Sequence, residues 1–269
     1  MNQTIITNIT QGLTTAFIDH TVSSNLAYRP QFISNNYKEG RKVISSIEDE
    51  LLSCEQFAIS VAFITMSGIT PLLQTLKELE KRGIPGRILT TDYLTFSDPK
   101  ALRKLEEFSN LHVKMYVTDQ KEEGFHTKGY IFKKEEMYRI IVGSSNMTLS
   151  ALTVNREWNT RIVSTEQGEY AQSVLTEFED LWNSPQAVEF EQFIDSYTEN
   201  YTRNKIIRKQ KELARQEQIP SLEAYRLQPN SMQTGFINNL QKIYDAGEDK
   251  ALLISATGTG KTYASAFAM

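Results

Sequence analysis

Cysteine and histidine are scarce in this chain. Its 269 residues include one cysteine, Cys54, and three histidines. A single thiol excludes an intrachain disulfide framework and favours a reducing compartment. One cysteine and three scattered histidines also do not make a zinc site, which is built from four such ligands or three and a water. Disulfide-stabilised secreted scaffolds and structural zinc domains are therefore excluded.

Long apolar runs and an excess of positive charge are missing as well. The N-terminus, MNQTIITNITQG, is polar, and no run is long and apolar enough to span a bilayer. We therefore expect no signal peptide, no membrane contact and a cytoplasmic location. The formal net charge is −4. Binding to nucleic-acid phosphates would require a local basic patch rather than the field of the whole chain.

The residues that are present predict a soluble α/β protein. Hydrophobic residues make up 40% and charged residues 23% of the chain, which is ordinary for a globular domain. The run 57–65, FAISVAFIT, is typical of a strand buried on both faces. Helices are predicted over 71–83, over 97–110 with Asp98 as N-cap and Pro99 at the first position, and over 168–184. Further strands are predicted at RILTTDYL, LHVKMYVTD, GFHTKGYIF, MYRIIVGS and WNTRIVS. This alternation predicts a layered sandwich with a central mixed sheet flanked by helices.

Two of these runs form a predicted hairpin around KKEE, residues 133–136. Residues two apart in a strand share a face, so His126 and Lys128 would point the same way as Tyr130. Pairing the strands so that each pair of residue numbers sums to 269 places Lys128 opposite 141 and His126 opposite Gly143. We expect the missing side chain of Gly143 to leave room beside the imidazole.

The returning strand would deliver the sequence GSSN beside His126. The site would then gather an imidazole, the Lys128 ammonium, the Ser144 hydroxyl and the Asn146 carboxamide. Such a set suits a phosphodiester: lysine and neutral donors stabilise charge on phosphorus oxygens, and histidine can carry a phosphoryl group. A helix opened by NMTLSAL would also attract anions. No carboxylate cluster accompanies these residues, so we expect no metal. The alternative is a half-buried strand histidine followed by a simple turn.

HTK followed by GSSN resembles the catalytic motif of the phospholipase D superfamily. The resemblance implies that His126 is the nucleophile or general acid and that Lys128, Ser144 and Asn146 bind phosphate. It also implies a supporting carboxylate, which Glu157 of NREWN could supply. The family pattern places an aspartate five residues after the lysine, where this chain has Lys133, and the spacing to GSSN is longer. The chain therefore resembles the divergent nuclease branch, which includes restriction endonucleases with one motif per chain.

A single motif implies a homodimer, because the family mechanism uses two histidines. One His126 would attack phosphorus and its symmetry mate would protonate the leaving oxygen across a two-fold axis. A second H-x-K, at His112 and Lys114, has no GSxN at hairpin distance, and we interpret it as part of the neighbouring strand.

The C-terminal stretch ALLISATGTGKTYASAFAM resembles motif I of superfamily 2 helicases of the DEAD/DEAH type. It has the strand, loop and helix order of a phosphate-binding loop, although Ser255 stands where the strict pattern has glycine. The resemblance implies ATP and Mg²⁺ as cofactors of a full-length helicase and an adenine-reading Gln233 upstream. The phosphate-binding residues would be Thr257, Gly258, Thr259, Gly260, Lys261 and Thr262. Because the chain ends seven residues after Thr262, we expect no ATPase or helicase activity from this polypeptide itself.

The resemblance to bacterial helicases that begin with a phospholipase D-like nuclease extends along the chain and predicts three regions. Residues 1–197 would be the nuclease domain, 198–226 a basic helical linker, and 227–269 the start of a RecA-like ATP-binding domain. The linker stretch 202–218 has a local excess of four positive charges; it is either a solvated helix or an arm that follows DNA.

The function predicted from these observations is a metal-independent DNA endonuclease that acts through a phosphohistidine in a homodimer and is natively fused to a helicase. Two alternatives stay open at this point. The first is a DNA-binding module that does not cleave, motivated by the missing aspartate and the negative net charge. The second is a phospholipase, which the lack of a secretory signal or membrane anchor disfavours.

Overall fold

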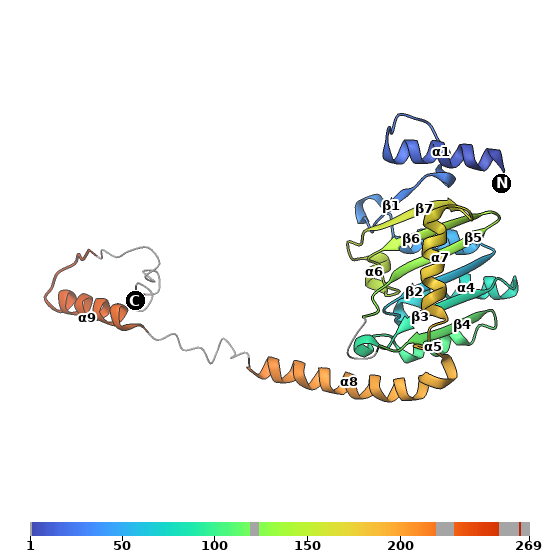
Figure 1. Ribbon diagram of the computed structural model, residues 1–269. Helices are drawn as coiled ribbons and strands as arrows, with labels where there is room; N and C mark the ends of the chain where they lie inside the picture. The colour runs from blue at the N-terminus through green and yellow to red at the C-terminus, as the bar shows by residue number, and fades with distance from the viewer. Residues whose placement is uncertain (1, 119–123, 219–228, 253–263, 265–269) are drawn as a thin grey trace. The chain divides into compact units, whose positions relative to one another are not determined.

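The computed structural model describes residues 2–118, 124–218, 229–252 and 264. The chain divides into two compact units, residues 1–208 and 209–269. The first unit contains an eight-stranded sheet (Figure 1). In spatial order its strands are β1 (Gln31–Ile33), β7 (Asn159–Thr165), β6 (Met137–Gly143), β5 (Lys128–Lys134), β2 (Gln56–Val61), β3 (Gly86–Thr91), β4 (Leu111–Tyr116) and β8 (Ala187–Glu189).

The sheet is mixed, as predicted. β2, β3 and β4 run parallel to one another, and every other neighbouring pair is antiparallel. All residues of β2 after the first are buried, which confirms the strand predicted to be covered on both faces. Parallel strands need helical crossovers that cover the sheet, and the helices between β2 and β4 supply this cover.

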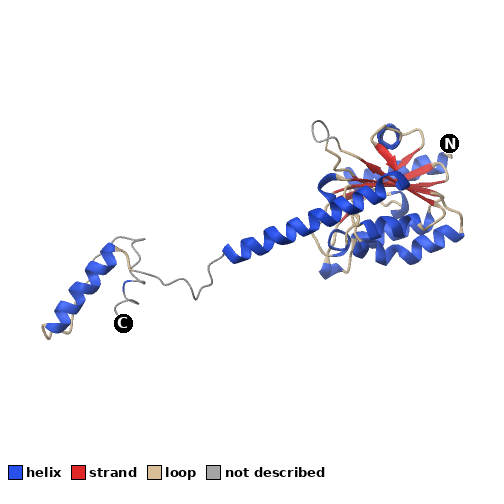
Figure 2. Ribbon diagram, turned by 90° about the horizontal axis from the view of Figure 1, so that it is seen from below, coloured by secondary structure: helices blue, strands red, loops and turns tan. Residues whose placement is uncertain are grey.

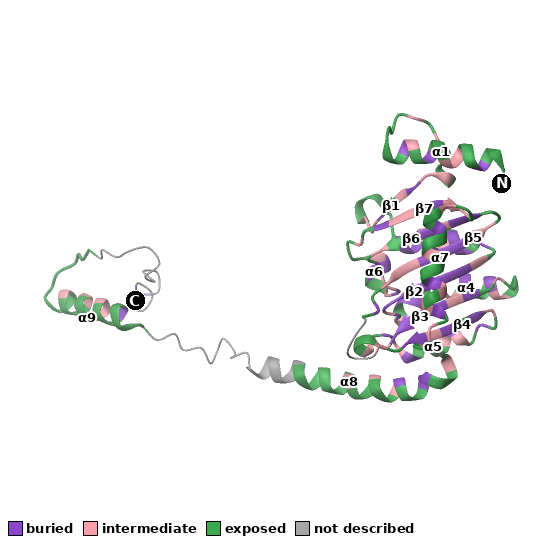
Figure 3. Cartoon of the chain, in the orientation of Figure 1, coloured by how far each residue is buried: buried purple, intermediate pink, exposed green. Residues whose placement is uncertain are grey.

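Helices lie on both faces of the sheet (Figure 2). One face carries α7 (Glu169–Trp182), whose Phe178 and Trp182 pack with Ile131 and Ile140. The other face carries the larger core, with side chains from α2 (Val43–Ser53), α4 (Leu73–Lys81), α5 (Pro99–Glu106) and the first turns of α8 (Phe190–Gln218). Most strand residues between these layers are buried (Figure 3). The α/β layered sandwich is therefore confirmed.

The remaining helices of the first unit are α1 (Gln3–Phe17), α3 (Met66–Ile69) and α6 (Leu149–Thr153). Local signals place several ends correctly. Asp98 caps α5 by accepting a hydrogen bond from the Lys100 N–H at 2.9 Å, and Pro99 occupies the first position of that helix. By contrast, the helix expected over NMTLSAL has only the five residues of α6, too short to add an anion site.

The hairpin register differs from the prediction by two residues. Lys134 pairs with Met137 and Tyr130 with Ile141, so paired numbers sum to 271. The turn is the two-residue Glu135–Glu136, with Glu135 in the left-handed region at φ 54°. Lys133 stays in the strand, where it pairs with Gln56 of β2 and Tyr138 of β6, and its ammonium lies 2.7 Å from Glu166 of the loop after β7. A shift of two preserves the faces, so the orientation argument survives the wrong register.

β5 also begins later than predicted. The last ladder pair between β2 and β5 joins Val61 to Lys128, so His126 lies in the segment before the strand rather than within it. β5 begins at Lys128 because its antiparallel partner β2 ends at Val61 and offers no further strand residues to pair with. His126 is therefore held by loop contacts.

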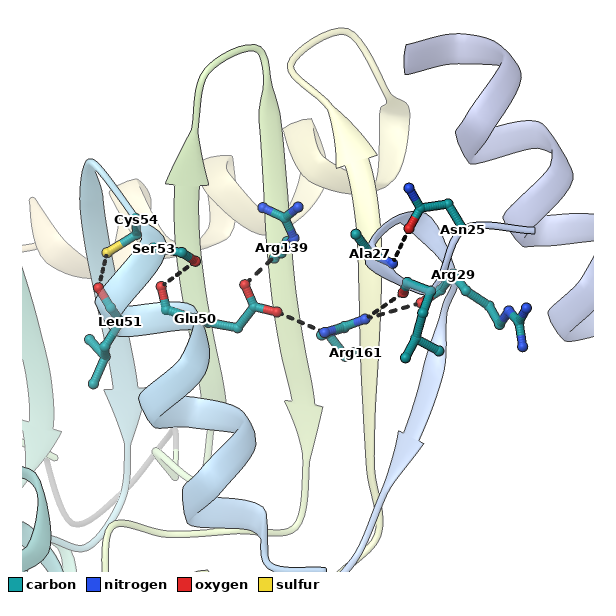
Figure 4. Close-up of polar contacts among 10 residues, drawn as sticks. Asn25, Ala27, Arg29, Glu50, Leu51, Ser53, Cys54, Arg139 and Arg161 are labelled. Atoms are coloured by element: carbon teal, nitrogen blue, oxygen red, sulfur yellow. Dashed lines mark hydrogen bonds and ion pairs between the residues drawn. The ribbon is translucent and has the colours of Figure 1, made fainter. Parts of the chain in front are cut away.

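A buried ionic cluster joins α2 to the sheet (Figure 4). Glu50 of α2 lies 2.9 Å from Arg161 and 3.5 Å from Arg139, on β7 and β6. Arg161 also donates to the carbonyl oxygens of Leu26 and Arg29, at 3.2 and 3.4 Å. The three charged side chains are only 6–13% exposed. This cluster ties the segment before β1 to the sheet.

α8 continues through residue 197, the predicted end of the nuclease domain. Phe193, Ile194 and Tyr197 of α8 belong to the core of the first unit, and the predicted linker is helical as far as Gln218. In the second unit, α9 (Ser231–Asp245) starts at the N-cap Asn230. The predicted domain boundaries stay predictions.

Candidate phosphodiester site

The chain just beyond β2 holds together the two segments that carry the predicted site residues. The Ala62 N–H donates to the Thr127 carbonyl at 3.1 Å. The Phe63 N–H donates to Asn146 Oδ1 at 3.1 Å, and the Met147 N–H donates to the Phe63 carbonyl at 3.0 Å. Phe63 therefore lies between the segment with His126 and the segment with Asn146.

His126 and Lys128 form one pair of contacting side chains in this region. The Lys128 ammonium lies 2.7 Å from His126 Nδ1 and donates to the His126 carbonyl at 2.8 Å. The imidazole is exposed and meets the Phe63 ring edge-on, with centroids 6.0 Å apart. An ammonium has no lone pair to accept with, so Nδ1 is the acceptor and the ring proton of the neutral tautomer lies on Nε2.

Ser144 and Glu157 form a second pair. The Ser144 hydroxyl donates to Glu157 Oε2, and the hydroxyl oxygen accepts from the Trp158 N–H at 3.1 Å. The Ser144 N–H donates to the Trp158 carbonyl at 3.1 Å. In this arrangement the hydroxyl hydrogen of Ser144 is engaged in a hydrogen bond to the Glu157 carboxylate. Asn146 differs: with Oδ1 engaged by Phe63, its Nδ2 is the donor it can offer an anion.

Glu157 also acts on Lys128 through its charge. Partial burial lowers the pKa of Lys128, and the negative charge of Glu157 opposes that shift. Partial burial first, and the neighbouring Lys128 charge second, lower the pKa of His126. The five residues therefore combine a neutral imidazole with an ammonium, an amide and a carboxylate-bound hydroxyl. We call His126, Lys128, Ser144, Asn146 and Glu157 the site cluster.

The lowered pKa of His126 gives a testable result. A ring that loses its proton below the ordinary value of 6.5 stays neutral, and hence nucleophilic, in mildly acidic solution. We expect the NMR titration of His126 to have its midpoint below pH 6.5, and Lys128→Gln to raise that midpoint by removing a nearby positive charge. The resonance is assigned by its loss in His126→Asn. A midpoint at or above 6.5 would contradict the contact with Lys128.

Three buried polar residues that the sequence reasoning missed fix the segment between Ser144 and Asn146. The Tyr130 hydroxyl donates to the Ser145 carbonyl at 3.0 Å. The Asn159 amide donates to Ser145 Oγ at 2.9 Å and accepts from the Ser145 N–H at 3.3 Å. All three residues are at most 2% exposed, and burial raises the pKa of Tyr130. The only sequence signal was the position of Tyr130 on the face of Lys128.

Gly143 has a different role from the one predicted. It pairs with Asn159 on β7, and an added Cβ would lie 2.2 Å from the Trp158 carbonyl oxygen and 2.4 Å from Asn159 Oδ1. The expectation that it makes room for His126 was wrong, because the ladder between β5 and β6 ends at Gly129 and Val142, and neither His126 nor Gly143 is part of it. Glycine is required here for the close approach of β7.

Gly143→Ala should therefore disturb the site cluster through Trp158 and Ser144. Overpacking of this kind costs about 1–3 kcal/mol of stability, and a displacement of about 1 Å can cost about 10²-fold in rate. Gly129→Ala in the same hairpin is the matched control, because a Cβ there meets nothing within 4 Å. Urea unfolding and phosphodiesterase assays compare the two. Equal behaviour of both variants would contradict the packing argument.

The second H-x-K has the structural role expected of it. Lys114 lies 2.8 Å from Glu189 of β8 and 4.9 Å above the Trp182 ring. His112 is its exposed neighbour on β4. These contacts are made with the edge strand and α7, not with the site cluster.

Of the predicted nucleotide-binding residues, only Gln233 is described. It is buried at the start of α9, where it forms a capping box: Asn230 Oδ1 accepts from the Gln233 N–H at 2.8 Å, and Gln233 Oε1 accepts from the Asn230 N–H at 2.9 Å. Thr257, Gly258, Thr259, Gly260, Lys261 and Thr262 lie outside the described residues. The adenine-reading role of Gln233 stays a prediction.

Two features of the described residues concern membranes and metal ions. None of the helices in this part of the chain combines the length and apolarity needed to cross a bilayer. Within the same residues, no three or more His, Cys, Asp or Glu side chains are grouped so that they could hold a metal ion.

Comparison with known families gives a match inside the first unit. Residues 49–182 match the family model described as "Cardiolipin synthase, PLD-like domain". We call this segment the PLD-like domain after that match. The match spans β2 to the end of α7 and so includes the whole site cluster. Residues 226–269, which contain the ATGTGKT stretch, match the model described as "Type III restriction enzyme, res subunit". The comparison with curated proteins gives no match.

Solved structures that are similar to this chain include NucT, Nuc and a phosphatidylserine synthase. NucT from Helicobacter pylori is 15% identical with a TM-score of 0.47, and the match covers 60% of this chain and 99% of NucT. Nuc from Salmonella typhimurium, titled a phospholipase D family member, is 19% identical with a TM-score of 0.45 and the same coverage. Phosphatidylserine synthase from Haemophilus influenzae is 15% identical, with a TM-score of 0.46, covering 69% of this chain and 46% of the synthase.

Proposed function

We propose that the PLD-like domain hydrolyses phosphodiester bonds in DNA without a metal ion, with His126 as the nucleophile. The observation that carries this proposal is the contact of His126 with Lys128 beside the Asn146 amide, at the end of β2 in a PLD-like domain. The Lys128 ammonium and the Asn146 Nδ2 are donors suited to the non-bridging oxygens, whose charge grows as phosphorus becomes five-coordinate.

The proposed reaction has two displacements. In the first, an imidazole nitrogen of neutral His126 forms a bond to phosphorus while the bond to the leaving oxygen breaks, and that oxygen takes a proton from a second imidazole that starts protonated, as imidazolium. In the second, water attacks phosphorus, its proton passes to the second imidazole, and the bond to His126 breaks. The first displacement leaves a phosphohistidine that still carries the other DNA ester, and the second displacement releases that strand with a terminal phosphate and returns both imidazoles to their starting state.

Substrate binding would have to free the nucleophile. Attack through Nε2 needs the ring proton on Nδ1, whereas Lys128 now keeps Nδ1 as an acceptor. A phosphate that draws the ammonium away would release Nδ1 and let the ring change tautomer. Glu157 supports this step by holding Ser144 and by keeping Lys128 charged against partial burial.

The second imidazole suggests a homodimer. One PLD-like domain brings one H-x-K to the site cluster, so a second copy of the chain would supply the other His126 across a two-fold axis. We also propose that the nuclease is natively fused to a cytoplasmic ATP-dependent helicase with ATP and Mg²⁺ as its cofactors. The match of residues 226–269 and the ATGTGKT stretch support that fusion.

The direct test is cleavage of DNA in the presence of EDTA, together with the solution mass of the chain. We expect cleavage to persist in EDTA because Lys128 and Asn146 supply the charge stabilisation that a metal ion would otherwise give. We also expect the mass of a dimer. Loss of cleavage in EDTA with recovery on adding Mg²⁺ would contradict the metal-free mechanism. Salt-dependent DNA binding without cleavage under any condition would favour the alternative, a binding module.

A further inference from the structure

The site cluster continues outward through a series of aromatic and cationic side chains. From the Phe63 ring, which meets His126, the Phe96 ring lies edge-on at a centroid distance of 5.1 Å. The Arg208 guanidinium of α8 lies 4.2 Å above the Phe96 ring. Neither the proposed chemistry nor the core requires this arrangement, since Phe96 is 41% exposed and Arg208 is exposed.

The same face of α8 extends the series. Tyr201, Lys205 and Arg208 are spaced four and three residues apart, so they share one face of the helix. The Lys205 ammonium lies 5.8 Å from the Tyr201 ring centroid. Toward the domain, the next ring along α8 is that of Tyr197, and the centroids of the Tyr201 and Tyr197 rings are 6.4 Å apart. The Tyr197 hydroxyl donates to the Ser97 carbonyl at 2.8 Å. We call Phe63, Phe96, Tyr201, Lys205 and Arg208 the aromatic track.

Backbone strain at residues 94 and 95 marks the loop that carries Phe96. Leu94 and Thr95 have φ angles of 56° and 47°, a conformation that costs a non-glycine residue about 1–3 kcal/mol and persists only where neighbouring groups enforce it. Here α8 enforces it. Arg208 donates to the Leu94 carbonyl and, at 3.1 Å, to Thr95 Oγ1, and Asn204 donates to Thr95 Oγ1 at 3.0 Å.

We infer that the aromatic track binds a single strand of nucleic acid that enters or leaves the site cluster. The exposed Phe96 ring, the half-buried rings of Phe63 and Tyr201 and the neighbouring cations offer what unpaired bases and their phosphates need: stacking surfaces and positive charge. Bases in a duplex are already stacked on one another and could not use Phe96. This inference rests on the proposed function for its substrate, and it adds that the strand is unpaired where it meets α8.

The test measures binding separately from chemistry. All binding variants are made in the full chain carrying His126→Ala, so that a fluorescein-labelled oligothymidylate is bound but not cleaved. Base stacking on an aromatic ring is sequence-tolerant, and its removal by alanine should weaken binding about 10-fold for Phe96→Ala. Lys205→Gln should lower the slope of log Kd against log salt by about 0.7 for one lost phosphate contact. Phe17→Ala on α1, also exposed, is the matched control and should leave Kd unchanged.

Three further measurements show whether weaker oligothymidylate binding comes from the lost aromatic ring. Phe96→Leu keeps an apolar contact with Phe63 but removes the ring, so it should bind about as weakly as Phe96→Ala; binding at the level of the parent would overturn the stacking role. An unlabelled duplex should compete poorly with the oligothymidylate, and equal competition would overturn the preference for a single strand. Thermal melting of each variant checks that the fold is intact.

Hydrolysis of bis(p-nitrophenyl) phosphate separates this inference from the proposed function. Phe96→Ala and Lys205→Gln with His126 intact should hydrolyse that small diester at the parental rate, because neither side chain contacts the site cluster. If the parent does not hydrolyse any diester, the proposed function fails while the binding result stands. If Phe96→Ala leaves oligothymidylate binding unchanged, the aromatic track fails while the proposed function stands.

Discussion

His126→Ala should lower phosphodiester hydrolysis by at least about 10³-fold, because it removes the proposed nucleophile rather than a supporting contact. The loss should appear with both DNA and bis(p-nitrophenyl) phosphate, since both substrates need the same attack on phosphorus. It should also appear in kcat, because the imidazole acts on the bound substrate. Initial rates under substrate saturation measure it.

The matched control is His112→Ala in the second H-x-K. His112 is exposed on β4, next to Lys114, which is engaged by Glu189 and Trp182. Its removal should leave the rate within about two-fold of the parent, in line with surface substitutions that change little. A His112 variant as inactive as the His126 variant would reverse the assignment of the two motifs.

Glu50→Ala should destabilise the first unit by about 3–5 kcal/mol, the cost of removing one partner from a buried ionic cluster. Arg139 and Arg161 would keep their charges at 12–13% exposure with no carboxylate between them. The loss should also loosen the segment before β1, because Arg161 holds the Leu26 and Arg29 carbonyls. Urea unfolding gives the change in free energy from the midpoint and the slope.

The pKa of Glu50 shows where that cost arises. Burial raises the pKa of Glu50 in spite of the two arginines, so its ionised form is no more stable here than in the unfolded chain. A raised pKa contributes stability only at low pH and loses it as the carboxyl ionises. The ion pairs therefore add little by themselves, and the expected loss comes from two uncompensated guanidinium groups. Asp49→Ala, exposed on the same helix, should cost no more than about 0.5 kcal/mol; an equal loss in both variants would contradict this.

Much of the fold follows from local signals in the sequence. The run of β2 predicts a strand covered on both faces because its apolar residues are continuous, whereas a strand with one face in solvent alternates apolar and polar residues. Asp98 and Pro99 place the start of α5 because capping depends only on adjacent residues. The members of the site cluster could be named for a similar reason, since their residue types and spacing resemble a known motif.

The details that depend on distant partners could not be predicted. The hairpin strand β5 also pairs with β2, where Lys133 lies opposite Gln56, 77 residues away in the sequence. The start of β5 depends on where β2 ends. Phe63 lies between His126 and Asn146 through backbone bonds that leave no trace in its residue type. The network of Tyr130, Ser145 and Asn159 likewise exists only once the strands are in place.

The most direct measurement of the central claim is the detection of a covalent phosphoryl group on His126. DNA or bis(p-nitrophenyl) phosphate is mixed with the full chain, the reaction is quenched in alkali to preserve phosphohistidine, and the peptides are weighed by mass spectrometry. Double displacement predicts that the peptide containing His126 gains the phosphoryl group together with the ester that stays on phosphorus, which is a p-nitrophenyl phosphoryl group when bis(p-nitrophenyl) phosphate is used. The same peptide from His126→Ala should gain nothing. Continued hydrolysis without any adduct, and with inversion of configuration at phosphorus, would contradict it.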